Sequence, residues 1–185
     1  MSIHNIFEVP IYQVQLDLDI ESIQLFCNKH QQKDSGRTIS NVGGYQSNDL
    51  DLNNTILTSL VEQIQTHSTK FANKLFDEPT TSCIENIWFN VNKYRNTNKC
   101  HNHPNQDISG VYYVKTPDEC GNIIFNNPAM NIENIWFDWS SYNSKNKTLP
   151  VSKNTLYLFP SWLNHYVEPN MNKTEERISF SFNTR

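Results

Sequence analysis

The sequence contains no long apolar run and no cluster of basic residues. Only 18% of its 185 residues are charged, and the formal net charge is −4. A protein that binds nucleic acid mainly through phosphate contacts needs a basic patch, which this chain does not offer. No segment approaches the roughly eighteen consecutive apolar residues that a membrane-spanning helix requires. We therefore expect neither a nucleic-acid partner nor a membrane span.

Cysteine is also scarce, with four residues and no C-x-x-C spacing. Four cysteines could form two disulfides, but the N-terminus, M-S-I-H-N-I-F-E-V-P, lacks the basic and then apolar pattern of a secretory signal. We expect reduced thiols and a cytoplasmic location, in a bacterial cell or a phage-infected host. The 26 asparagines are typical of an AT-rich genome, such as that of a marine bacterium or its phage.

The first part of the chain has the patterns of one strand and two helices. Alternating apolar residues indicate a strand, and apolar residues spaced by three or four indicate a helix. Aspartate and asparagine are favoured as the N-cap residues of helices. The predicted elements are a strand over residues 6–16, a helix over 19–32 capped by Asp19, a loop over 33–49 that turns at Gly43-Gly44, and a helix over 52–76 capped by Asn53 or Asn54.

From residue 83 onward the apolar period changes to two, which is the period of strands. Prolines and glycines separate these stretches, and many short strands are typical of an antiparallel sandwich or barrel. Since the chain has no internal repeat and no low-complexity linker, we expect residues 1–185 to form one mainly β domain, with 1–82 flanking a core of 83–185. The expected strands cover residues 84–94, 108–115, 122–125, 132–139, 155–159, 164–167 and 177–183.

The most informative stretch is H-N-H-P-N-Q-D-I-S-G-V-Y-Y-V, which begins at His101. Side chains two residues apart on an extended segment point the same way, so His101 and His103 can aim at one point. A distant histidine, His165, follows the run F-P-S-W-L-N. A divalent metal needs imidazole nitrogens within about 2.0–2.2 Å of one point. An H-x-H pair alone is a weak signal, but with a distant histidine and a late R-x-S it indicates a metal site.

Four motifs carry a resemblance to a known family: H-x-H-P-N, S-G-V-Y-Y-V, F-P-S-W-L-x-H-x-V and E-R-I-S-x-S-F-N, with G-G-Y-Q-S earlier in the chain. Together they resemble the Fe(II)/2-oxoglutarate-dependent dioxygenases, and in particular a branch of mostly uncharacterised bacterial and phage proteins. The resemblance covers about residues 7–183. It implies a mainly β fold, the cupin-like double-stranded β-helix or jelly roll, with flanking N-terminal α-helices.

The resemblance also implies Fe(II) as cofactor and 2-oxoglutarate as cosubstrate. Arg177 takes the place of the residue that pairs with the far carboxylate of 2-oxoglutarate, a role that suits a planar guanidinium. Ser179 faces the same way along its strand and can add a hydroxyl donor. Tyr113 is similar in position to a tyrosine that contacts the cosubstrate, although its neighbour Tyr112 could take that role instead.

The metal ligands implied by the resemblance are His101 and His165, and the sequence departs from the family at the third ligand. The usual triad has two histidines and one carboxylate, but the carboxylate position here is His103. Three readings stay open: His103 ligates directly, Asp107 supplies the carboxylate, or two side chains and water hold the metal. Asp107 lies six residues after His101, about 20 Å away if extended, so it needs a tight turn. Strand geometry favours His103.

We therefore expect an oxygenase that hydroxylates a small-molecule or peptide substrate with molecular oxygen and releases succinate and CO2. The alternative is a cupin-like protein that binds a metal or small molecule without turnover; a phage structural β-sandwich is the third reading. Arg177 favours the first, and the missing carboxylate favours the second. The resemblance also makes a homodimer plausible. The segment 126–153 is the expected lid, and a candidate substrate wall is Trp136, Phe137 and Trp139.

Overall fold

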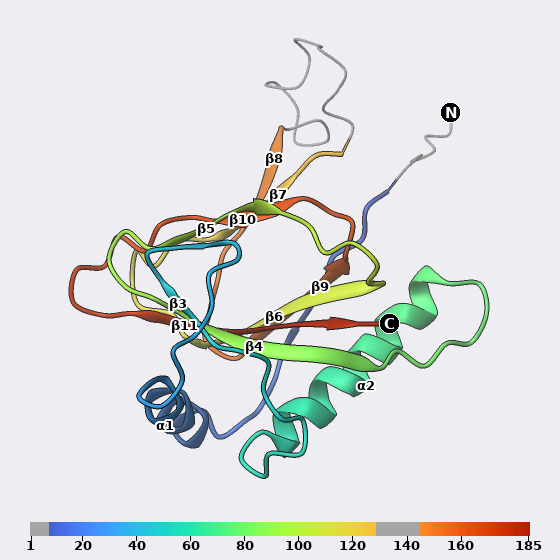
Figure 1. Cartoon of the computed structure of the whole chain (residues 1–185). Helices are drawn as coiled ribbons and strands as arrows, with labels where there is room; N and C mark the ends of the chain where they lie inside the picture. Colours follow the sequence, from blue (N-terminus) through green and yellow to red (C-terminus); the bar gives the residue numbers. More distant parts are fainter. Residues whose placement is uncertain (1–7, 129–144) are drawn as a thin grey trace.

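The computed structural model describes residues 8–128 and 145–185, which form two antiparallel sheets and two helices (Figure 1). The six-stranded sheet has the order β1 (Tyr12–Gln15), β9 (Thr155–Pro160), β6 (Ile108–Lys115), β11 (Arg177–Thr184), β4 (Ile84–Asn92) and β3 (Tyr45–Gln46). The five-stranded sheet has the order β2 (Asn41–Val42), β5 (Thr97–His101), β10 (His165–Val167), β7 (Ile123–Asn126) and β8 (Asn146–Leu149).

The chain passes back and forth between the two sheets. From β4 it crosses to β5, returns to β6, crosses to β7 and β8, returns to β9, crosses to β10 and ends in β11. Within residues 8–128 and 145–185, every strand pair is antiparallel. This winding is that of a double-stranded β-helix, so the predicted mainly β jelly roll with flanking N-terminal helices is confirmed.

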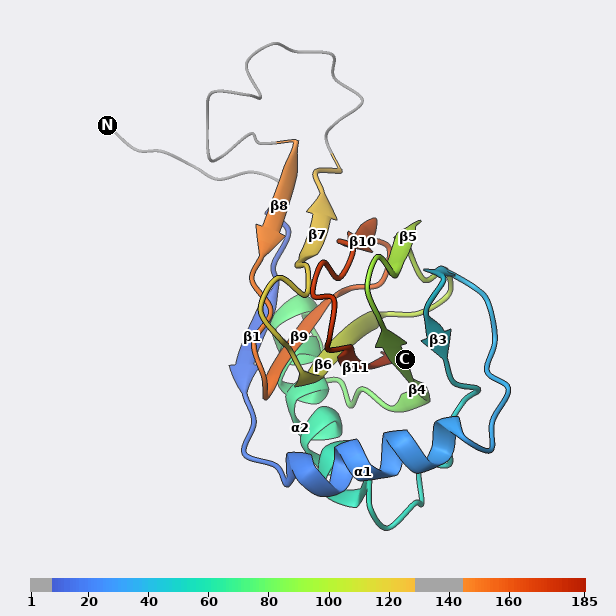
Figure 2. The same cartoon turned by 90° about the vertical axis from the view of Figure 1, so that its left-hand side faces the viewer.

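Both helices cover the outer face of the six-stranded sheet, away from the five-stranded one (Figures 1 and 2). α1 (Ile20–Gln31) and α2 (Thr58–Leu75) bury their apolar stripes there. Ile178 and Phe180 of β11 belong to the same buried cluster as Leu60 and Ile64 of α2. Because side chains alternate along a strand, this packing directs the polar residues of β11 into the space between the sheets.

The predicted cap of the first helix is confirmed, and the predicted cap of the second is wrong. The Asp19 carboxylate accepts a hydrogen bond from the backbone N–H of Ser22. The second helix begins at Thr58, six residues later than expected, and its N-cap is Leu57 without a side-chain hydrogen bond. The Asn54 side chain instead accepts from the backbone N–H of Ile56. It therefore closes a turn that precedes the helix, which local sequence alone does not distinguish from a helix cap.

Four of the strands were not predicted from the sequence. β2 and β3 lie in the segment expected to be a loop, and with two residues each they are too short to show alternation. β5 is polar, T-N-K-C-H, and β8 is N-K-T-L at a sheet edge. The strand expected over 6–16 is shorter and begins at Tyr12, two residues after Pro10, which cannot donate to a ladder.

Two predictions fall wholly or partly outside the described residues. The strand expected over 132–139, with Trp136, Phe137 and Trp139, lies outside them, as does the middle of the expected lid.

The four cysteines are free thiols. In the part of the chain that the structure describes, no helix is both long and apolar enough to cross a membrane.

Candidate functional site

An inner cavity lies between the two sheets and brings together the candidate residues from the sequence. Its walls come from β4, β6 and β11 on one side and from β5, β7 and β10 on the other. The lining residues are Ser40, Trp88, Asn90, Asn98, His101, His103, Gly110, Val111, Tyr113, Ile123, Phe159, His165, Val167, Arg177, Ser179 and Ser181.

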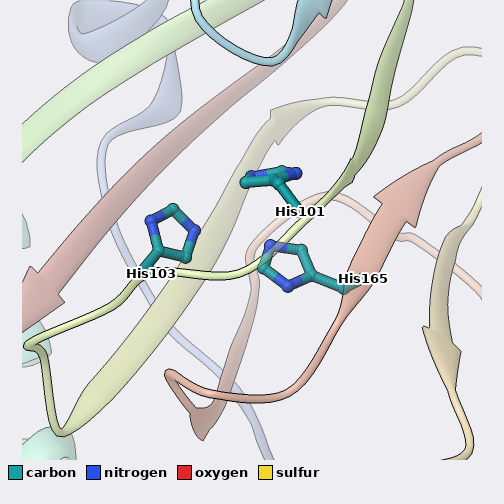
Figure 3. A group of neighbouring side chains, drawn as sticks. All are labelled: His101, His103 and His165. Carbon is teal, nitrogen blue, oxygen red and sulfur yellow. The ribbon is translucent and has the colours of Figure 1, made fainter.

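The three candidate metal histidines lie close together (Figure 3), and all three line the inner cavity. Their potential ligand atoms all lie within 4.8 Å of one another. The ring centroids of His101 and His165 are 4.4 Å apart, and those of His103 and His165 are 5.3 Å apart. Among the described residues, this is the one group of three or more histidine, cysteine or acidic side chains with the spacing of a metal site.

A β-bulge directs His101 into the cavity. His101 pairs with His165, while Asn98 pairs with Val167, so three steps along β5 oppose two steps along β10. The extra residue places Asn98 and His101 on the same side of the strand, and both line the cavity. Bulges of this kind often re-aim a side chain next to an active site.

His103 reaches the same place by another route than the sequence suggested. The H-x-H pair does not lie on one strand, because β5 ends at His101 and His103 follows in the connection to β6. Its backbone N–H donates to the Ser161 carbonyl at 2.9 Å. Its ring packs against Trp88 with the centroids 6.0 Å apart. A tertiary hydrogen bond and an aromatic contact, rather than strand register, therefore position His103.

Two backbone carbonyls determine which imidazole nitrogens remain available. Nδ1 of His101 lies 2.7 Å from the Lys99 carbonyl, and Nδ1 of His165 lies 2.9 Å from the Leu163 carbonyl. Since a carbonyl oxygen only accepts, each Nδ1 carries the proton and each Nε2 keeps its lone pair. Metal-bound histidines are usually oriented by such a bond from the other ring nitrogen.

Burial keeps all three imidazoles neutral near pH 7. It lowers the pKa of His101, and it lowers the pKa of His103 to about 4 and that of His165 to about 3. Proximity to His101 lowers the last two pKa values further. Since a histidine ligates a metal only in its neutral form, the site needs no deprotonation before metal binding.

Asp107, the alternative source of a carboxylate ligand, lies elsewhere. It is exposed, its backbone N–H donates to the Thr184 carbonyl, and it is not part of the histidine group. The turn at Pro104-Asn105, where Asn105 has a φ of +66°, leads the chain into β6 rather than back to the histidines. Of the candidate third ligands, the structure brings His103 to the site and leaves Asp107 outside it.

A buried guanidinium and a buried phenol lie toward the other end of the inner cavity. Arg177 and Tyr113 are each only 1% exposed. Nη1 of Arg177 donates to the carbonyls of Cys120 and Glu168, whereas Nη2 is buried without a partner. The Tyr113 hydroxyl is also buried without a partner. Two unsatisfied donors in one cavity are uncommon and indicate a missing acceptor.

The register of the strands gives the sequence of residues along the cavity wall. Ser179 lies between Asn90 and Tyr113, and Ser181 lies between Trp88 and Val111. Arg177 is the next inward position beyond Ser179, and inward positions on a strand are about 6.8 Å apart. Trp88 packs on His103, one of the candidate metal ligands. The wall therefore runs from the histidines, through a middle row of polar groups, to Arg177.

The neighbouring tyrosine faces the other way. Tyr112 belongs to the apolar cluster under the helices, and its hydroxyl donates to Oδ1 of Asn154 at 2.6 Å. Tyr113, not Tyr112, therefore lines the cavity.

Asn90 is a cavity residue that none of the quoted motifs contains. Its Nδ2 donates to the Ser181 hydroxyl at 3.2 Å, and its Oδ1 is buried without a partner. The alternation in I-W-F-N-V-N puts Asn90 on the face opposite Phe89, so the sequence predicts that Asn90 lines the mouth of the cavity, and the structure places it in the cavity lining.

Several solved structures share the fold of this chain. A prolyl-4-hydroxylase from Pseudomonas putida is 12% identical and has a TM-score of 0.65, with 95% of this chain and 91% of that chain covered. The viral collagen prolyl hydroxylase of Paramecium Bursaria Chlorella virus-1, in complex with 2-oxoglutarate, is 15% identical with a TM-score of 0.60 and 95% of each chain covered. HygX from Streptomyces hygroscopicus, with nickel and 2-oxoglutarate bound, is 7% identical with a TM-score of 0.63, covering 95% of this chain and 82% of that one. At these identities the likeness concerns the fold.

Sequence comparison identifies the family. No curated protein matches the chain. A family described as "Putative 2OG-Fe(II) oxygenase" matches residues 86–183, more than half of the chain. The match includes the three histidines and Arg177, and the family implies Fe(II) and 2-oxoglutarate, with which the histidine group is consistent. The chain belongs to this 2OG-Fe(II) oxygenase family and is an oxidoreductase.

Proposed function

We propose that this protein is an Fe(II)- and 2-oxoglutarate-dependent dioxygenase that hydroxylates a small-molecule or peptide substrate and releases succinate and CO2. One observation carries the proposal. The inner cavity has three neutral imidazoles at one end and an incompletely paired guanidinium and phenol toward the other. A cupin-like binding protein without turnover would need the imidazoles but not the buried cation.

The proposed metal ligands are His101, His103 and His165, and their arrangement fits a metal ion. Ligands at about 2.1 Å from a metal lie roughly 3.0–3.4 Å from one another. The ligand atoms here lie within 4.8 Å, so small side-chain rotations suffice. The carbonyls of Lys99 and Leu163 fix two of the rings in the tautomer that can bind.

The proposed cosubstrate contacts are Arg177, Tyr113 and Ser179. A carboxylate accepts from both the free Nη2 of Arg177 and the Tyr113 hydroxyl, which satisfies both orphaned donors. The guanidinium stays in place through its bonds to the Cys120 and Glu168 carbonyls. When bound, Fe(II) and 2-oxoglutarate supply the oxygen activation, and the protein contributes orientation and exclusion of water.

The neighbours include prolyl hydroxylases, and HygX has a solved structure with hygromycin B bound, so the fold is compatible with more than one substrate class. The homodimer, the single-domain organisation and the lid stay predictions.

The proposed function is tested by anaerobic titration. Adding Fe(II) and then 2-oxoglutarate should produce a weak visible charge-transfer band, and a cupin-like binder should give none. Admission of oxygen with the substrate should then release succinate. If metal binds stoichiometrically and saturating 2-oxoglutarate gives neither a band nor a measurable affinity, the oxygenase proposal fails.

Replacing His103 should weaken metal binding far more than replacing Asp107. We expect His103→Ala to lose at least about 100-fold in Fe(II) affinity, since even groups behind the ligands contribute about 10–100-fold. Asp107→Ala should change the affinity less than about twofold, because this side chain is exposed and outside the histidine group. Competition with a chelator measures both. If Asp107→Ala weakened Fe(II) binding more than His103→Ala, Asp107 would be the ligand. The loop after Pro104 would then have to change conformation when the metal binds.

A further inference from the structure

A second hollow, which we call the outer groove, opens on the metal end of the inner cavity. Its walls include Arg37, Ile39, Gln46, Lys99 and Gln106. It shares four lining residues with the inner cavity: Ser40, Trp88, His101 and His103. A molecule in the outer groove would therefore lie directly beside two of the proposed metal ligands.

The outer groove carries charge of one sign. Arg37 and Lys99 line it, and none of the groove-lining residues that the structure describes is aspartate or glutamate. This contrasts with the whole chain, which has 19 acidic and 15 basic residues. The nearby acid Asp49 binds the Arg37 guanidinium from one side, with Nη2 donating to Oδ1 at 2.6 Å. Among the described residues, the Lys99 ammonium forms no ion pair.

Arg37 is held in place but is not fully satisfied. Its guanidinium carbon lies 5.5 Å from the centroid of the Trp88 ring, a cation–π distance. Its Nε is buried without a hydrogen-bond partner. The Trp88 ring in turn packs on His103. One aromatic ring therefore separates an incompletely paired guanidinium from a proposed metal ligand.

We propose that the outer groove binds the substrate through an oxyanion, a carboxylate or a phosphate, held by Arg37 and Lys99. The Arg37 guanidinium suits an oxyanion because it presents several N–H groups in one plane, and Lys99 adds a second positive charge. Trp88 and the exposed Ile39 give the adjoining part of the substrate an apolar surface. The identification of this ligand as the oxidised substrate rests on the proposed function, whereas the anion site does not.

NMR of the full-length protein, without iron or 2-oxoglutarate, tests the site. The Nε–Hε resonance of Arg37 is assigned by its loss in Arg37→Lys. The probes are benzoate, phenyl phosphate and the neutral match benzamide. We expect a saturable shift of this resonance with benzoate, phenyl phosphate or both, and none with benzamide; the anion that shifts it identifies the preferred group. Lys99→Gln should weaken binding about two- to fivefold, as expected for an exposed charge.

The same spectrum contains its control. Arg95 also lies over an aromatic ring, 5.2 Å from that of Tyr94, but does not line the outer groove, so its Nε resonance should not move. The anion site is excluded if no anion shifts the Nε resonance of Arg37 more than that of Arg95. It is also excluded if benzamide shifts the Arg37 resonance as much as benzoate does. A shift at Arg177 without one at Arg37 would exclude the outer groove site and leave the proposed function standing.

Discussion

Replacing Arg177 by alanine should lower the affinity for 2-oxoglutarate by about thirty-fold to several thousand-fold and leave Fe(II) binding intact. The guanidinium is 1% exposed and has one nitrogen without a partner. Truncating one member of a buried, hydrogen-bonded charge pair costs roughly 2–5 kcal/mol, and each 1.4 kcal/mol is about tenfold in affinity. Fe(II) binding should persist because the histidines lie at the other end of the cavity.

Two further variants separate loss of a contact from loss of structure. Arg177→Met keeps most of the volume and removes a buried, incompletely paired charge, so the thermal midpoint should not fall strongly while the affinity does. Arg177→Lys should recover part of the affinity, since a point charge replaces a planar fork. The control is Arg185→Ala, because the Arg185 side chain is 60% exposed and outside both hollows.

The measurement is an anaerobic 2-oxoglutarate titration of the Fe(II)-loaded protein, followed by the charge-transfer band. Unchanged affinity in both Arg177→Ala and Arg177→Met would remove the oxygenase proposal. That result would weigh more than any result at the metal, since the cupin-like alternative also binds metal.

Replacing His165 or His101 by alanine should abolish stoichiometric Fe(II) binding. Each variant removes one of the three proposed ligands. In both His101 and His165, a backbone carbonyl accepts from Nδ1 and leaves Nε2 free to bind the metal. We expect the affinity to fall at least about 100-fold, the upper end of the effect of groups behind the ligands. Equilibrium dialysis with Fe(II) under anaerobic conditions measures the stoichiometry.

Folding needs its own control here, since His165 is 4% exposed and packs on Phe159 with the centroids 4.6 Å apart. His67→Ala is a matched variant, because it removes a histidine that accepts or donates a hydrogen bond with the Tyr12 hydroxyl far from the cavity. It should lower stability and keep one Fe(II) per chain. Far-UV circular dichroism of all three variants should report an intact fold. Full metal occupancy in His165→Ala or His101→Ala would exclude the site.

The sequence by itself determined the mainly β fold class and which residues of a strand share a face. The alternation in R-I-S-F-S-F-N separates a polar face with Arg177 and Ser179 from an apolar face with Ile178 and Phe180, whatever the rest of the chain does. The helical spacing in 19–32 and the Asp19 cap depend on neighbouring residues alone. Local periodicity is a property of the covalent chain, so it can be read without the tertiary structure.

The tertiary structure decided which face is inside and how the site closes. Two helices cover the apolar face of β11, and only then does the polar face become the cavity wall, with Tyr113 inside and Tyr112 outside. The bulge opposite β10 re-aims His101, and the Ser161 carbonyl with Trp88 positions His103. The pairings of His101 with His165 and of His103 with Ser161 each join segments about sixty residues apart. No periodicity within one segment encodes such a pairing, because its energy depends on both partners being folded together.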